Sequence, residues 1–162
     1  MNRKEKKNHV ENIIKNNNVF DDLLELDRDV LNFRPDLNDN PWTIHEHVIH
    51  CLEVDIANFT RYRVGIVKPG TEIISMNDSW TEKLNYQSID LSTAIQTIKL
   101  IRKMTYDHFL SLIDDDWTKY SFFYDKYGDL NFEVFVPVFY RHPVGHREFI
   151  DRNIKLWKEV SK

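Results

Sequence analysis

Two histidines near the end of the chain, His142 and His146, stand four residues apart. They continue a stripe of apolar and aromatic side chains that recurs at three- and four-residue steps from Phe135 to Val160. This spacing is typical of one face of an α-helix, so both imidazoles face the same way, one turn apart. Such a pair can reach a single metal ion, and neutral imidazole favours zinc, nickel, copper or iron. The competing interpretation is a pair of hydrogen-bonded core residues, and the spacing alone does not decide between the two.

A catalytic metal held by two histidines needs a third protein ligand and an open position for water. The candidates are His45, His47 and His50, which lie together in another helical stretch. On a helical wheel His50 lies roughly opposite the main apolar stripe of that stretch, so periodicity predicts that it is exposed. The same argument favours His47, at the edge of the stripe. The residues by themselves leave the third ligand open.

Four stretches of helical periodicity have to position these histidines. They span roughly residues 10–31, 44–64, 91–112 and 130–160. The second begins at Thr43-Ile44-His45-Glu46, which has the form of a capping box. The segments between the last three stretches, including a short helix expected near residues 76–80, show no convincing strand pattern. The sequence therefore predicts an all-α protein, an antiparallel four-helix bundle forming one domain over residues 1–162.

Asparagines and prolines mark where these helices weaken. The run Asn16-Asn17-Asn18 weakens the first helix in its middle, where we expect a break. Pro137 and Pro143 fall inside the last helix, and each removes a backbone donor, which predicts a kink or a restart. Because Pro143 directly follows His142, a kink there would move that imidazole out of helical spacing.

Composition narrows the classes of function. The net charge of −4 gives no support for a nucleic-acid-binding surface. The single cysteine, Cys51, rules out an internal disulfide and a cysteine-cluster metal site. No apolar run approaches the length of a membrane span, and the charged N-terminus lacks the apolar core of a signal peptide. We therefore expect a cytoplasmic protein with neither a nucleic-acid nor a membrane partner.

The segment from Trp42 to Glu53 resembles the signature of the DinB/YfiT-like superfamily, in which a tryptophan opens a helix and a histidine follows eight residues later. The similarity continues through Phe59-Thr60-Arg61-Tyr62-Arg63, Trp80, and the stretch from Tyr140 to His146. It covers roughly residues 20–157. Members of this family are antiparallel four-helix bundles that bind a divalent metal, usually nickel or zinc, through three histidines.

In that family one ligand comes from the second helix and two come from the last helix. The resemblance therefore implies that His50, His142 and His146 bind a divalent metal ion, nickel or zinc. Close relatives often carry adjacent histidines at the second position on the last helix, whereas Gly145 precedes His146 here. His146 therefore keeps the ligand position of the family, whereas the adjacent histidine is replaced by Gly145.

The resemblance implies a small-molecule substrate and leaves several functions open. The family includes metal-dependent hydrolases and transferases that use a low-molecular-weight thiol, and both chemistries use the same three ligands. The alternative is a non-catalytic module that binds a small molecule or serves in a stress response. A purely structural role for the histidines is a further alternative. Family members are often homodimers, so a homodimer is a further expectation.

Three other polar residues have both a chemical and a structural interpretation. Glu46 lies one turn before His50 and could act as a base, but the capping box explains it without chemistry. Asp55 could hydrogen-bond a ligand histidine, although we expect it to be solvated at the surface. Arg61 could bind an anionic substrate, although a surface ion pair is the favoured interpretation.

Overall fold

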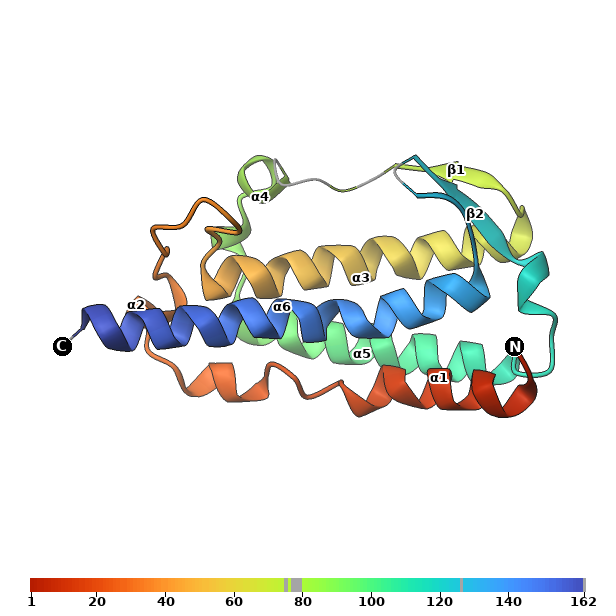
Figure 1. Ribbon diagram of the computed structural model, residues 1–162, viewed down its shortest axis with the longest axis horizontal. Helices are drawn as coiled ribbons and strands as arrows, with labels where there is room; N and C mark the ends of the chain where they lie inside the picture. Colours follow the sequence, from red (N-terminus) through yellow and green to blue (C-terminus); the bar gives the residue numbers. More distant parts are fainter. Residues whose placement is uncertain (75, 77–79, 126, 162) are drawn as a thin grey trace.

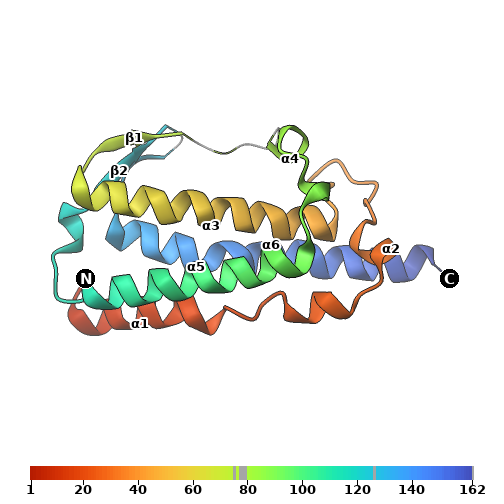
Figure 2. The ribbon, with the colours of Figure 1, turned by 180° about the vertical axis from the view of Figure 1, so that it is seen from behind.

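The computed structural model describes residues 1–74, 76, 80–125 and 127–161. Four long helices lie side by side along the length of the molecule (Figures 1 and 2): α1 (Arg3–Lys15), α3 (Ile44–Val67), α5 (Leu91–Ser111) and α6 (Phe132–Val160). Helices α3 and α1 each pack against both α5 and α6. The predicted four-helix arrangement is therefore confirmed.

The helix directions differ from the simple antiparallel arrangement that we expected. Helix α3 ends at one end of the molecule, whereas α4 (Trp80–Lys83) and η2 (Tyr86–Ser88) lie near the end at which α3 begins (Figure 1). As a result, α3 and α5 run in the same direction, whereas α1 and α6 run opposite to them. We expected a short helix near residues 76–80, and most of these positions lie outside the described residues. Helix α4 begins at the last of them, Trp80.

The ends of α1 and α3 follow from local chemistry. Helix α1 stops at Lys15, directly before the asparagine run, and the chain continues as η1 (Asp21–Glu25) and α2 (Arg28–Leu31). The expected break is confirmed. At the start of α3 the Glu46 amide donates to Thr43 Oγ1 (3.1 Å) and the Thr43 amide donates to Glu46 Oε2 (2.8 Å), which confirms the capping box. Glu46 also pairs with Arg34, so its role is structural.

Helix α6 runs without interruption through Pro137 and Pro143. The expected restart at these prolines does not occur. The Asn131 side chain accepts hydrogen bonds from the first-turn amides of the helix, and buried Phe135 and Phe139 anchor its first half. Because α6 stays continuous, the one-turn spacing of the histidine pair is retained.

A small sheet corrects the expectation of a strictly all-α protein. Its strands are β1 (Thr71–Ile73), β2 (Ser121–Tyr124) and β3 (Gly128–Asn131), in the order β1-β2-β3. Strand β1 is parallel to β2, and β2 is antiparallel to β3. Phe122 and Ile73 are buried beneath the sheet. Gly65 of α3 lets β2 approach closely, because a Cβ there would lie 3.0 Å from the Ser121 carbonyl oxygen.

The apolar core forms two clusters along the bundle. The cluster near the sheet includes Tyr62, Phe109 and Tyr140, and the other includes Leu52 and Ile150. The turns of α3, α5 and α6 between these clusters carry polar side chains that are buried or half-buried, and these belong to the site described next. In the described part of the chain, no helix is long and apolar enough to cross a membrane.

Candidate metal centre

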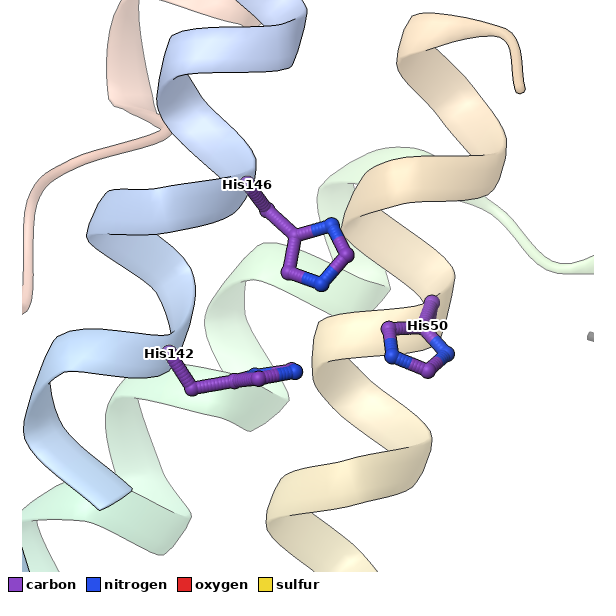
Figure 3. A group of neighbouring side chains, drawn as sticks. All are labelled: His50, His142 and His146. Atoms are coloured by element: carbon purple, nitrogen blue, oxygen red, sulfur yellow. The ribbon is translucent and has the colours of Figure 1, made fainter. Parts of the chain in front are cut away.

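Three histidines from two helices converge in the middle of the bundle. His50 extends from α3, and His142 and His146 extend from α6 toward it (Figure 3). One ring nitrogen from each lies within 4.8 Å of those from the other two. The ring centroids are separated by 5.3 Å for His50–His142, 4.8 Å for His50–His146 and 4.6 Å for His142–His146. Because a zinc–nitrogen bond is about 2.0–2.1 Å long, small side-chain rotations would be needed to bring all three nitrogens onto one divalent ion.

Helix packing explains why His50 faces this centre. Periodicity predicted that His50 is exposed, but α3 packs against both α5 and α6 and so buries two faces. The prediction of exposure was wrong, because a helical wheel identifies only the wider apolar face. The structure brings together the three residues that the family resemblance indicated, and metal binding by them stays a prediction.

His47 is a fourth imidazole in contact with this group. It is fully buried, and its Nδ1 lies 3.0 Å from Nδ1 of His146. One of these two nitrogens therefore donates and the other accepts. Because His146 Nδ1 is engaged in this way, its Nε2 is the nitrogen left for a metal ion. A metal-bound imidazole normally hydrogen-bonds through its other nitrogen, and His47 supplies that partner here. Periodicity favoured His47 as the third ligand. In the structure His47 instead contacts His146, one of the three candidate ligands.

Trp42 covers the same histidines. Its ring centroid lies 4.8 Å from that of His50 and 6.1 Å from that of His146, and the His146 ring is nearly parallel to it. The Trp42 carbonyl accepts a 2.7 Å hydrogen bond from Asn153 Nδ2 of α6, which ties the start of α3 to the last helix. The place of Trp42 in the family signature was the signal that it belongs to the site.

The site keeps its imidazoles uncharged at neutral pH. Burial, reinforced by the neighbouring charges, lowers the pKa of His47 and of His146 to about 3 and that of His50 to about 4. The pKa of His142 lies well below its usual value because of burial and, secondarily, the charges around it. Nδ1 of His142 is buried and has no hydrogen-bond partner among the described residues. The group is thus a set of neutral nitrogen donors, which suits a metal cation.

A buried ion pair lies next to the histidines. Arg102 of α5 donates from Nε to Asp55 Oδ2 (2.6 Å) and from Nη2 to Asp55 Oδ1 (2.9 Å). Arg102 Nη2 also lies 3.4 Å from the Phe139 carbonyl oxygen, almost one turn before His142 on α6. The expectation that Asp55 is solvated was wrong, because its carboxylate faces α5 rather than water. The pair joins the three helices α3, α5 and α6 near the histidines.

A cavity of about 210 Å³ opens beside two of the three histidines. Its wall is mainly apolar and aromatic, and its lining includes His50, Val54, Asn58, Arg61, Phe122, Tyr124, Phe135, Val138, Phe139 and His142. A small molecule in this cavity would contact the imidazoles at one end. The sequence had shown no sign of the cavity, since the sheet that supplies part of its wall was not predicted.

Neither a protein-family model nor a curated protein sequence matches the chain. The structure of YfiT from Bacillus subtilis is similar, with a TM-score of 0.81 over 98% of this chain and 90% of that chain, at 15% sequence identity. The chain has the YfiT fold. YfiT is described as a probable metal-dependent hydrolase with an unusual four-helix bundle topology. The likeness confirms the fold that the resemblance implied.

Proposed function

We propose that this protein is a metal-dependent hydrolase of small molecules, with His50, His142 and His146 as ligands of a divalent ion. The observation that carries the proposal is the convergence of three ring nitrogens within 4.8 Å of one another. The cavity beside them supplies room for a substrate. Three imidazoles suit zinc, nickel, copper or iron, and the family resemblance favours nickel or zinc among these.

When bound, a zinc ion with three imidazole ligands and an open position would lower the pKa of bound water to about 7, which would make a nucleophile available. The surrounding residues prepare the site for this chemistry. Burial keeps the imidazoles neutral, so their lone pairs are free. His47 holds the ring of His146 in one orientation, and Trp42 shields the group from one side.

The thiol-dependent S-transferase and the non-catalytic binding module would use the same residues. A transferase would bind a low-molecular-weight thiol at the open position, whereas a binding module would hold its ligand without turnover. We extend the proposal to a homodimer in the cytoplasm, with neither nucleic-acid nor membrane partners. The sequence supports this extension only through the family resemblance and composition.

The test compares the metal content of the wild-type protein with that of a variant in which His50, His142 and His146 are all alanine. His45→Ala is the matched control, since His45 lies on α3 but bonds to Gln87 and the Ile89 carbonyl, away from the site. We expect roughly stoichiometric metal in the wild type and the control, and none in the triple variant. Equal, negligible metal in all three proteins would refute the proposal.

Activity assays on nickel- and zinc-loaded protein then separate the functions. Ester hydrolysis that the triple variant lacks supports the hydrolase. Transfer that requires an added thiol would replace it with the S-transferase, and saturable binding without turnover would replace it with the binding module.

A further inference from the structure

Arg61 stands at the far end of the cavity from the histidines. Four residues on one stripe of α3 line the cavity in order: His50, Val54, Asn58 and Arg61. At the rise of an α-helix, Asn58 and Arg61 lie about 12 and 16 Å along the axis from His50. A molecule that fills the cavity therefore meets imidazoles at one end and a guanidinium at the other.

The guanidinium of Arg61 is held in place by contacts with Asn58, Ile74 and Tyr124. Its Nη1 donates to Asn58 Oδ1 (3.2 Å), its Nη2 donates to the Ile74 carbonyl, and it lies over the ring of Tyr124, 5.5 Å from the centroid. Among the described residues, these two bonds use two of the five N–H donors of a guanidinium. The remaining donors make no hydrogen bond to the part of the chain that the structure describes, and a ligand in the cavity could accept from them.

The charge of Arg61 is partly shielded from water. Burial lowers the pKa of Arg61, while Tyr124 and Asp125 act in the opposite direction by smaller amounts. A partly buried cation is stabilised when an anion replaces the water that it has lost. Because Asp125 already contributes a negative charge nearby, a single negative charge fits better than a double one.

We propose that Arg61, positioned by Asn58, binds a carboxylate of an elongated substrate whose apolar middle fills the cavity and whose reacting group lies at the histidines. This inference rests on the proposed function and assigns its substrate class. It also replaces the surface ion pair that the sequence suggested for Arg61.

The test is calorimetric binding of phenylhexanoate and of its neutral analogue phenylhexanamide, to metal-free and to zinc-loaded protein. The variant is Arg61→Gln. Arg63→Gln is the control, because Arg63 donates to the Phe59 carbonyl (2.7 Å) and does not line the cavity. We expect wild type and Arg63→Gln to bind the carboxylate about tenfold or more tightly than the amide, with or without zinc. Arg61→Gln should bind both probes alike.

A preference for the carboxylate that persists in Arg61→Gln would overturn the inference. A preference that requires zinc would also overturn it, because the carboxylate would then be bound at the histidines. Arg61→Lys keeps the charge and should recover part of the preference. This recovery would show that the loss in Arg61→Gln comes from the missing charge and not from a folding defect. If the protein shows the Arg61-dependent preference but binds no metal, the proposed function is refuted and the carboxylate site is supported.

Discussion

Replacing Arg102 with methionine should lower the free energy of unfolding by about 3–5 kcal/mol. The side chains of Arg102 and Asp55 are 1% and 0% exposed, so neither group reaches water when its partner is removed. The change removes two short charge-assisted hydrogen bonds, each worth about 1.5–3 kcal/mol, and leaves the Asp55 carboxylate buried without its cation. Methionine has a similar volume, so lost packing contributes little.

The double variant Asp55→Leu/Arg102→Met separates charge from packing. It buries no unpaired ion, and we expect it to be clearly more stable than Arg102→Met alone. Lys103→Met is the surface control, since Lys103 pairs with Asp107 and both side chains are more than half exposed. That change should alter the unfolding free energy by less than about 1 kcal/mol.

The assay is urea unfolding followed by circular dichroism, with all four proteins metal-free at one pH. A loss of unfolding free energy below about 1 kcal/mol in Arg102→Met would contradict the argument, because removing one partner of a buried ion pair leaves the other desolvated and unpaired. A double variant less stable than the single one would contradict it as well.

Three further changes test other parts of the site and fold. His47→Phe keeps the packing of the ring but removes its nitrogens, so metal affinity should fall about 10- to 100-fold by competition with a chelator, while His45→Phe should leave it unchanged. The metal-free protein should lose stability as the pH falls from about 6.5 toward 4, because His47 and His146, with pKa values of about 3 when folded, take up protons first in the unfolded chain. The loss is at most about 1.4 kcal/mol per pH unit for each histidine, measured by urea unfolding at several pH values. Gly65→Ala should lower the free energy of unfolding by about 1–3 kcal/mol, because the new Cβ would lie 3.0 Å from the Ser121 carbonyl oxygen.

Each of these three has an outcome that contradicts it. Unchanged metal affinity in His47→Phe would mean that His47 does not orient His146. Unfolding that is independent of pH between 6.5 and 4 would mean that the buried imidazoles are protonated as easily as exposed ones. Gly145→Ala is the control for the glycine change, since a Cβ there meets nothing within 4 Å. Equal stability of the two alanine variants would contradict the close approach of β2 to α3.

Local signals in the sequence predicted the helices well. The capping box at Thr43 and the asparagine run after Lys15 each act within a few residues, and both set a helix end as expected. The strands were missed because the paired residues of β1 and β2 lie 51 positions apart in the sequence and each strand is too short to show alternation. The restart predicted at Pro143 was wrong because buried neighbours outweigh one missing donor.

The sequence by itself determined the four helical stretches, the cap at Thr43 and the one-turn pairing of His142 with His146, since these depend on neighbours along the chain. The family resemblance added His50 to the pair. Only the tertiary structure decided which side of α3 is buried, because that depends on two other helices at once. It brought His50 to the pair, placed His47 behind His146, and buried Asp55 against Arg102. A single sequence shows the periodicity of a helix, whereas the contacts of its second face arise from distant segments that pack together.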